Sequence, residues 1–361
     1  MKIGIDIREL RTDSLTGTAR ILRTALPLLA KDNSNQYVLF ANQFTDTANL
    51  LAANMRIVRR KEFFTFFYDQ FTLPVLLKKE KTDVFVSPYF KCPLIKVCRY
   101  VVYIHDLHFL KPILRKGLEK IRPYLIYLKL ILKVADKVIT VSNFSKKEIL
   151  RILKAPVEKI VVIYNPIGEN LLSFLPDENK KEEARIKYGL FGKYFLYVGN
   201  FFAHKNVQGL IKAYKMLSKK LLEDYNLVLV GKKDVNFRGI QDLINSLGLQ
   251  EKIKVIDFVC DDDMPYIYHG ASLFIYPSFY EGFGYPPLEA LACGARVISS
   301  DATSLPEVLR DKVVYFNPQS PEFIKNAILQ GLEQPLPRAG ELLSIYKSDK
   351  FIKEFIQNVS I

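Results

Sequence analysis

The chain has 361 residues, which is enough for two domains, and a formal net charge of +14. Hydrophobic residues make up 49% of it and charged residues 25%, a composition typical of a soluble, globular protein. It holds no run of about twenty apolar residues that would span a membrane, and residues 1–6 begin as a strand rather than as a signal peptide, so we expect a cytoplasmic location. The cysteines lack Cys-x-x-Cys pairing and zinc spacing, which argues against a metal site and a disulfide framework and favours buried thiols at Cys92, Cys98, Cys260 and Cys293.

The amino-terminal half alternates short apolar strands with helices. Strands are expected at 2–8, 36–40, 83–86, 100–104, 137–141 and 160–163, and helices at about 17–30, 69–79, 116–134 and 144–153. A basic, aromatic segment at 59–68 follows the second strand. This alternation predicts a doubly wound parallel sheet.

The pattern lapses at 165–183, where prolines, a glycine and a charged stretch predict a linker. The alternation then restarts, with strands expected at 194–198, 226–230, 254–259, 272–277 and 295–300 and helices at 206–217, 240–247, 264–269 and from Pro287 to about 293. An amphipathic stretch at 351–359 has helical spacing and needs an apolar surface to cover. We therefore expect an α/β chain of two domains, 1–167 and 168–344, with a helix at about 345–361 packing back on the first.

Residues 281–289, Glu-Gly-Phe-Gly-Tyr-Pro-Pro-Leu-Glu, join a buried strand to a helix. In open α/β sheets ligands bind beyond the carboxyl ends of the strands, where this loop lies. Gly282 and Gly284 are expected to leave backbone amides open to a phosphate, which a helix amino end also favours. A carboxylate beside such a site, here Glu289, can accept both hydroxyls of a ribose. The alternative is that Glu289 only caps its helix and complements the helix dipole.

Three other segments follow expected strands and could reach a cleft between two such domains. His105 follows the run 100–104 and could hydrogen-bond a sugar hydroxyl, or be a satisfied turn histidine. Gly17 opens a helix and could let the backbone approach a diphosphate or a sugar, or serve only in a turn. Lys205 precedes a helix for which Asn206 is the expected cap. It could neutralise charge on a departing diphosphate, or be a solvated surface charge.

Together these segments resemble the family-4 retaining glycosyltransferases of the GT-B architecture over essentially the whole chain. Residues 277–294 are similar to the family's Glu-x7-Glu segment, and 197–200 with 204–206 (His-Lys-Asn) are similar to its diphosphate loop. Residues 16–17, 104–107, 138–145, 162–166 and 304–307 also follow the family pattern. The resemblance implies two Rossmann-like, doubly wound domains that face a cleft, the first on the acceptor side and the second binding the nucleotide sugar.

The resemblance also implies a role for each matched residue. Glu281, Lys205 and His105 are expected to be catalytic, with Glu281 beside the transferred sugar and Lys205 facing the diphosphate. The donor-binding residues implied are Glu289, Gly282, Phe283, Gly284, Tyr285, His204, Asn200, Val259 and Gly17. Three positions depart from the family pattern: Ala19 replaces a frequent glycine, and Asn200 and His204 replace basic residues. These departures place more of the diphosphate charge on Lys205 and on helix amides.

The implied reaction moves a hexose from a nucleotide diphosphate sugar to a hydroxyl with retention of configuration, without a metal or a cofactor. GDP-mannose is the first expected donor, because the His-Lys-Asn variant resembles bacterial mannosyl- and rhamnosyltransferases of surface polysaccharide or lipopolysaccharide synthesis. UDP-hexoses are the alternative. A noncatalytic nucleotide-sugar-binding partner and a nucleic-acid-binding protein are alternatives of other classes, but no nucleic-acid-binding motif is present. An oxidoreductase is disfavoured, because neither half has Gly-x-Gly-x-x-Gly after its first strand.

The charge is concentrated in the amino-terminal half. Residues 1–165 hold 29 Lys and Arg against 14 Asp and Glu, whereas residues 166–361 hold 23 against 24. We expect this half to dock to an anionic membrane surface, so that the protein acts peripherally at the inner face of the cell membrane on a lipid-linked or oligosaccharide acceptor. The candidate contact is 59–61 with Phe63, Phe64, Phe66 and Phe67. The alternatives are that the charge serves only solubility and that this segment is the edge of a core element.

Overall fold

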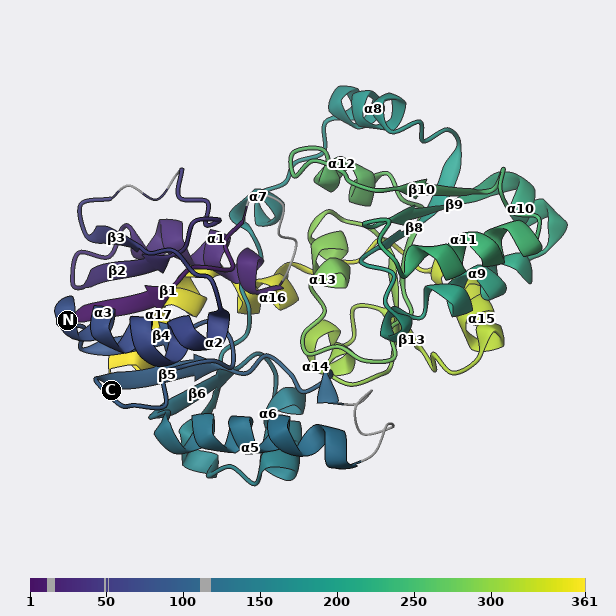
Figure 1. Cartoon of the computed structure of the whole chain (residues 1–361). Helices are drawn as coiled ribbons and strands as arrows, with labels where there is room; N and C mark the ends of the chain where they lie inside the picture. Colours follow the sequence, from purple (N-terminus) through teal and green to yellow (C-terminus); the bar gives the residue numbers. More distant parts are fainter. Residues whose placement is uncertain (12–16, 49, 51, 111–117, 361) are drawn as a thin grey trace. The chain divides into compact units, whose positions relative to one another are not determined.

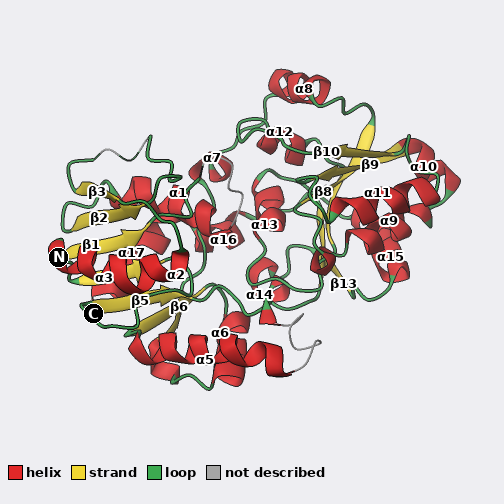
Figure 2. Cartoon of the chain, in the orientation of Figure 1, coloured by secondary structure: helices red, strands yellow, loops and turns green. Residues whose placement is uncertain are grey.

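A computed structural model describes residues 1–11, 17–48, 50, 52–110 and 118–360. The chain divides into two compact units, Met1–Pro166 with Tyr346–Ile361, and Ile167–Ile345. Each unit is a parallel sheet with helices on both faces (Figures 1 and 2). The predicted α/β class with two doubly wound domains is confirmed. Among the described helices, none combines the length and the apolar character that crossing a bilayer requires.

The amino-terminal unit is built on seven described strands in the order β3-β2-β1-β4-β5-β6-β7, and all neighbouring strands run parallel. The strands are β1 (Lys2–Asp6), β2 (Gln36–Ala41), β3 (Met55–Arg59), β4 (Val84–Ser87), β5 (Arg99–Tyr103), β6 (Lys137–Thr140) and β7 (Ile160–Val162). Their helices are α1 (Gly17–Leu29), α2 (Thr65–Phe67), the π-helix η1 (Tyr68–Thr72), α3 (Leu73–Lys79), α5 (Leu118–Val134), α6 (Asn143–Leu153), the 3-10 turn η2 (Val157–Lys159) and α17 (Ser348–Ser360). The start of the predicted helix at 116–134 lies outside the described residues.

The central strands of this sheet are buried on both faces, because successive side chains alternate between two helical layers. Val86 of β4 and Tyr103 of β5 line a small apolar hollow together with Leu22 of α1 and Phe355 of α17. The neighbouring residues of the same strands, such as Phe85, belong instead to a core shared with α3, α5 and α6. The amphipathic stretch at the end of the chain therefore covers the α1 face of the first sheet.

The carboxy-terminal unit is built on six described strands in the order β10-β9-β8-β11-β12-β13, again all parallel. The strands are β8 (Lys193–Val198), β9 (Tyr225–Val230), β10 (Ile253–Ile256), β11 (Leu273–Tyr276), β12 (Val297–Ser300) and β13 (Val314–Phe316). The helices include α9 (Val207–Lys215), α10 (Lys219–Asp224), α11 (Phe237–Ser246), α12 (Met264–His269), α13 (Tyr285–Ala292), α14 (Leu305–Leu309), α15 (Pro321–Glu333) and α16 (Gly340–Leu343), with the 3-10 turns η3 (Ala203–Lys205) and η4 (Ser344–Tyr346).

Alternating side chains again separate two helical layers. Phe195 of β8 packs edge-on against Tyr214 of α9, while its neighbour Tyr194 donates a hydrogen bond to the carbonyl of Ile267 in α12 (2.8 Å). Figure 1 shows α9, α11 and α15 together on the far side of this sheet from α12 and α13. The loops at the carboxyl ends of these strands carry most of the predicted donor-binding residues.

Several boundaries differ from the prediction. Residues 165–183 are not only a linker: they contain α7 (Glu169–Leu172) and the start of α8 (Glu178–Lys187), which the Asp177 carboxylate caps by accepting two backbone amides. Helix α8 is charged along most of its length, so it lacks the apolar periodicity on which the prediction relied. Strands β3 and β13 were missed because each is a short, half-buried edge strand. Of the four cysteines, Cys92 and Cys293 are buried and the other two are half-buried.

Gly231, just beyond β9, is required by a close approach of two backbones. A Cβ atom there would lie 2.0 Å from the carbonyl oxygen of Gly199, just beyond β8. We expect Gly231→Ala to lower the free energy of unfolding by about 3 kcal/mol, because a strand end must move to relieve the overlap. Gly340→Ala is the matched control, since a Cβ atom at Gly340 meets nothing within 4 Å. Chemical denaturation measures both, and equal stabilities would contradict the prediction.

Candidate functional site

The predicted catalytic residues of the carboxy-terminal unit lie where its strand order reverses. Strands β9 and β10 lie on one side of β8, and β11, β12 and β13 on the other. The loops after β8 and β11 diverge at this point, and open α/β sheets bind ligands there. Lys205 follows β8 and Glu281 follows β11, and the Phe279 amide joins the two loops by donating to the His204 carbonyl (2.7 Å).

Lys205 and Glu281 form a largely buried ion pair. The Lys205 Nζ lies 2.7 Å from Glu281 Oε1, and the side chains are 13% and 10% exposed. The same ammonium lies 3.3 Å from the Tyr276 hydroxyl at the end of β11, and 5.6 Å from the centre of that ring. Lys205 is therefore not a solvated surface charge. It is a cation held in place between two loops at a strand-order reversal.

Glu281 remains ionised in this setting. Burial by itself would raise the pKa of its carboxyl, but the charge of the Lys205 ammonium and its hydrogen bond to Glu281 outweigh burial and lower the pKa below its ordinary value. The site therefore carries a fixed positive and a fixed negative charge at neutral pH. An incoming phosphate group would compete with Glu281 for the ammonium.

The glycine-rich turn leads into α13, which begins at Tyr285 rather than at the predicted Pro287. Gly284 precedes the helix with φ of +96°, and a Cβ atom there would also lie 2.5 Å from the Leu305 side chain, so only glycine fits. Pro286 and Pro287 carry no N–H. The backbone donors of this helix start therefore come from Gly284 and Tyr285 and, before them, from Gly282 and Phe283.

Thr303 and Ser304 were not among the predicted site residues, but they hold this turn from the next loop. The Thr303 hydroxyl accepts a hydrogen bond from the Glu281 amide (2.9 Å). The Ser304 hydroxyl lies within hydrogen-bond distance of the carbonyls of Glu281 and Phe283 (3.0 and 3.2 Å). Thr303 has φ of +59°, a strained conformation for a β-branched residue. Strained backbone conformations of this kind cluster at functional sites. The family-like pattern at 304–307 was the signal that pointed to this segment.

Glu289 lies in the second turn of α13 and is largely buried. Its Oε2 accepts a hydrogen bond from the hydroxyl of Tyr268 in α12 (2.8 Å), and the Tyr268 ring is fully buried. The carboxylate is thus oriented by a neighbouring helix. The alternative interpretation, that Glu289 only caps its helix, does not fit this position. Only the first turn of a helix has unpaired amides, and Glu289 lies beyond it.

Three other predicted donor-binding residues, Asn200, His204 and Val259, lie between strands and helices of the same unit. Asn200 is half-buried, and its carbonyl accepts from the hydroxyl of Tyr197, which fixes the loop that leads to His204. Asn206 does precede α9, but it adopts a left-handed conformation and donates from its side chain to the Pro318 carbonyl, so the predicted capping bond is wrong. Val259 is buried, but β10 ends at Ile256, so Val259 lies in a loop and not in the predicted strand.

His105 and Gly17 lie in the amino-terminal unit. The His105 Nε2 donates to the Pro88 carbonyl (2.8 Å) and lies 3.4 Å from the Thr18 hydroxyl. Burial lowers the pKa of His105 despite the Pro88 carbonyl and Asp106, so the ring is neutral near pH 7 and its Nδ1 is an acceptor. Gly17 begins α1, and a Cβ atom there would meet nothing within 4 Å. Thr16, the other half of that predicted motif, lies outside the described residues.

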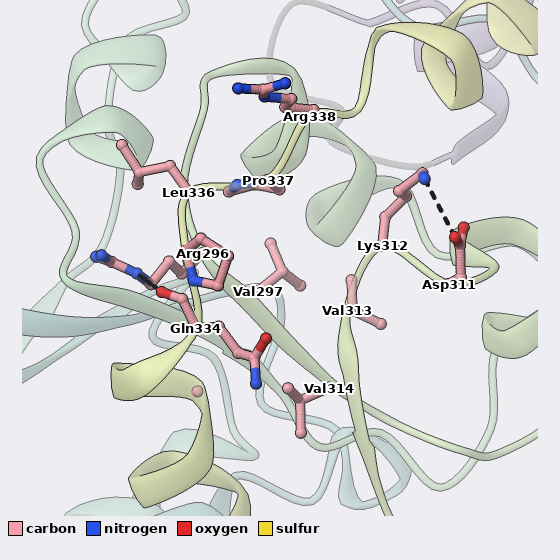
Figure 3. A pocket seen from close by; sticks show the side chains of 12 residues that line it. Arg296, Val297, Asp311, Lys312, Val313, Val314, Gln334, Leu336, Pro337 and Arg338 are labelled. Atoms are coloured by element: carbon pink, nitrogen blue, oxygen red, sulfur yellow. Dashed lines mark hydrogen bonds and ion pairs between the residues drawn. The ribbon is translucent and has the colours of Figure 1, made fainter.

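A cavity of about 490 Å³ opens elsewhere in the carboxy-terminal unit, between the amino-terminal ends of β12 and β13 and the segment after α15 (Figure 3). Its basic residues are Arg296, Lys312 and Arg338. Arg296 donates to the Gln334 carbonyl (2.6 Å), and Lys312 pairs with Asp311 (3.2 Å). The cavity lies at the opposite strand ends from Lys205 and Glu281, so it is not the predicted donor site. Within the described ranges, no group of three or more His, Cys, Asp or Glu side chains is placed to hold a metal ion.

Comparison with known protein families matches both halves of the chain. Residues 31–170 match the model described as Glycosyltransferase Family 4, and residues 180–347 match Glycosyl transferases group 1. The O-antigen chain mannosyltransferase RfbU of Salmonella typhimurium is 26% identical over 99% of this chain and 96% of its own length. The O-antigen chain mannosyltransferase B of Escherichia coli is 36% identical over 55% of this chain.

That second match spans only 52% of mannosyltransferase B, and a match to the E. coli mannosyltransferase WbdA, 30% identical, spans 24% of that protein. Among solved structures, Anabaena Alr3699/HepE with UDP and glucose has a TM-score of 0.78 at 18% identity, covering 100% of this chain and 99% of its own. WaaG, a glycosyltransferase involved in lipopolysaccharide biosynthesis, has a TM-score of 0.72 at 16% identity over 97% and 94%. The chain therefore belongs to the glycosyltransferases with a family 4 amino-terminal half, a group 1 carboxy-terminal half and the GT-B fold.

Proposed function

We propose that this protein transfers a hexose from a nucleotide diphosphate sugar to a hydroxyl of a growing glycan, with retention of configuration and without a metal ion. The observation that carries the proposal is the buried Lys205–Glu281 pair at the strand-order reversal of the carboxy-terminal sheet, beside the amides of residues 282–285. The nucleotide is held by the carboxy-terminal unit, with its ribose hydroxyls on Glu289. The amino-terminal unit takes the acceptor, with His105 and Gly17 contributing from its strand and helix ends.

The chemistry requires stabilisation of the leaving group. The bond between the anomeric carbon and the diphosphate oxygen breaks with its electron pair on that oxygen, and the acceptor oxygen bonds to the same carbon as its proton passes to the diphosphate. The Lys205 ammonium and the amides of Gly282 to Tyr285 stabilise the charge that develops on the diphosphate. Glu281 orients Lys205 and places a negative charge beside the sugar, where positive charge develops at the anomeric carbon.

Mannose from GDP-mannose is the proposed donor. Two observations support this donor. RfbU, which matches nearly the whole chain, and mannosyltransferase B, which is 36% identical over 55% of it, are both named O-antigen mannosyltransferases. The loop at 204–206 also has the His-Lys-Asn form. We propose a lipid-linked or oligosaccharide acceptor in cell-surface polysaccharide or lipopolysaccharide synthesis. The excess of cations in residues 1–165 supports work at the anionic inner face of the cell membrane.

A screen of GDP-, UDP- and dTDP-sugars by thermal shift, followed by donor hydrolysis without acceptor, tests the assignment. We expect GDP-mannose to give the largest rise in melting temperature and to be hydrolysed slowly. A UDP-hexose that stabilises the protein more strongly would replace the donor. Binding without hydrolysis or transfer would favour a noncatalytic role, and salt-sensitive retention on DNA without sugar-nucleotide binding would overturn the proposal.

Glu289→Gln is expected to weaken binding of the nucleoside diphosphate by about 10- to 100-fold, because hydrogen bonds to a charged carboxylate each contribute about 1.5 to 3 kcal/mol. Glu322→Gln is the matched control, since Glu322 lies in the first turn of α15 and is exposed. Isothermal titration with GDP and UDP measures both. Loss of stability in Glu289→Gln with unchanged nucleotide affinity would assign Glu289 a structural role.

A further inference from the structure

The start of the helical segment formed by α2, η1 and α3 has an inverted distribution of polar and apolar residues, whereas α3 itself buries leucines and exposes Lys78 and Lys79. Six large apolar side chains within residues 63–75 are between 55% and 82% exposed: Phe63, Phe64, Phe66, Phe67, Phe71 and Val75. Its polar residues Asp69 and Gln70 are buried, as is Tyr68. Helices on the surface of globular proteins show the opposite arrangement. Exposed apolar patches of this kind mark contact surfaces.

Buried polar contacts hold the segment in this orientation. Asp69 accepts from the Arg8 guanidinium (2.5 Å), which also lies 4.2 Å above the Tyr68 ring. The Gln70 side chain donates to the Cys92 carbonyl (3.2 Å) and accepts from the Leu94 amide (2.9 Å). These three inward residues are consecutive and lie in the π-helical turn, a feature frequent at functional sites. The segment cannot turn its phenylalanines inward without breaking these bonds.

The exposed charges around the phenylalanines are cationic. Arg60, Lys61, Lys78, Lys79 and Lys81 are all exposed. The acidic residues of the same stretch are withdrawn into the fold. Glu62 accepts hydrogen bonds from Asn42 and Thr65, and Asp69 and Glu80 are buried. A further exposed phenylalanine, Phe44, adjoins the segment, because its neighbour Gln43 exchanges two hydrogen bonds with the backbone of Glu62.

We propose that residues 60–79 form a docking surface that seats in the interface of an anionic lipid bilayer, with the phenylalanines among the acyl chains and the flanking cations on the headgroups. Aromatic and basic side chains without exposed acids fit this environment. A second copy of the chain fits less well, because the same face would bring like charges together. The proposal rests on the proposed function in that it names the surface by which the enzyme reaches a lipid-linked acceptor.

Cosedimentation with vesicles of phosphatidylglycerol or of phosphatidylcholine tests the surface without any sugar nucleotide. The wild-type chain is expected to bind the anionic vesicles, and high salt should weaken this binding. Phe63→Ser/Phe66→Ser/Phe67→Ser should lower the partition coefficient by about 100-fold, and Arg60→Gln/Lys61→Gln by about 30-fold. The matched control is Phe191→Ser/Phe323→Ser/Leu336→Ser, which removes three exposed apolar side chains of the carboxy-terminal unit and should bind as wild type.

Three results would overturn the docking surface. The first is equal vesicle binding by the wild type and the triple phenylalanine variant. The second is a fall in the melting temperature of that variant, which would show that the face packs within the folded chain. The third is a wild-type dimer that resists salt and that the triple substitution dissociates. Lys205→Met should bind vesicles as wild type does. A wild-type chain that binds vesicles but no sugar nucleotide would contradict the proposed function and leave the docking surface standing. A wild-type chain that binds a sugar nucleotide but no vesicles would contradict the docking surface and leave the proposed function standing.

Discussion

Lys205→Met is expected to lower sugar transfer severely and to lower the free energy of unfolding of the protein. Removing one preorganised donor to a developing oxyanion typically costs about 10²- to 10³-fold in turnover. The same substitution leaves the Glu281 carboxylate buried without its cation, which costs about 3 to 5 kcal/mol. Steady-state transfer and urea unfolding measure the two effects.

A double variant separates these two effects. Lys205→Met/Glu281→Gln removes both charges, so the free energy of unfolding should recover most of the loss while transfer stays as low as in Lys205→Met. Glu281→Gln alone should retain nucleotide binding and lose most transfer, since Lys205 remains near the diphosphate. Unchanged turnover in Glu281→Gln would remove Glu281 from the active site. Recovery of transfer in the double variant would show that the pair is only structural.

The pH dependence of stability should change sign at this site. In the wild type the lowered pKa of Glu281 contributes stability above the carboxyl's ordinary pKa, and this contribution is lost as the pH falls through the folded pKa. In Lys205→Met the ammonium is gone and burial remains, so the pKa of Glu281 rises above its ordinary value. The deficit of the variant relative to the wild type should therefore shrink between pH 7 and pH 5.

Arg8→Met is expected to have the largest effect on stability in the amino-terminal unit, about 3 to 5 kcal/mol. The buried guanidinium contacts three carboxylates: Asp6 at 2.7 Å, Asp69 at 2.5 Å and Glu62 at 3.3 Å. Methionine fills a similar volume but leaves these charges uncompensated. Arg56→Met is the matched control, because Arg56 is 71% exposed and lies 3.5 Å from Glu80, so its loss should cost less than about 1 kcal/mol. Similar losses in both variants would contradict the assignment.

Asp69 provides a pH signature of the same cluster. Burial raises the pKa of Asp69 to about 6. The positive charge of Arg8 opposes this rise, and the negative charge of Asp6 adds to it. Between about pH 4 and pH 6 the folded chain therefore retains a proton that the unfolded chain has lost, and stability falls as the pH rises through this window. Asp69→Asn should remove about 3 kcal/mol of that fall. Parallel slopes for the variant and the wild type would show that Asp69 is ionised throughout.

The two sheets use their strand-order reversals differently. In the amino-terminal sheet the order reverses between β1 and β4, and there Arg8, Asp69 and Tyr89 form a buried network with Asp6 at the end of β1. The chain's own ion pairs occupy the position at which such sheets bind ligands. In the carboxy-terminal sheet the reversal also carries a buried ion pair, Lys205–Glu281, but a glycine-rich turn and the start of a helix lie beside it. This difference supports nucleotide binding by the second unit.

Much of the fold was predictable because buried parallel strands are near-continuous apolar runs and their helices are amphipathic. The runs at 100–104 and 194–198 correspond to β5 and β8 for this reason. Segments without that signal were missed. Helix α8 is charged along its length, and β3 and β13 are short edge strands with little burial. Helix α15 has a clear apolar face, yet it was not among the predicted helices.

The sequence by itself determined the fold class, the family and the segment from Glu281 to Glu289, because glycines, prolines and apolar runs act locally and their spacing is legible along the chain. Only the tertiary structure decided which charges meet. Lys205 and Glu281 are 76 residues apart, and Arg8 and Asp69 are 61 apart. Each pair forms because parallel strands bring distant loops to one sheet edge, and burial then turns an ordinary lysine or arginine into a fixed charge.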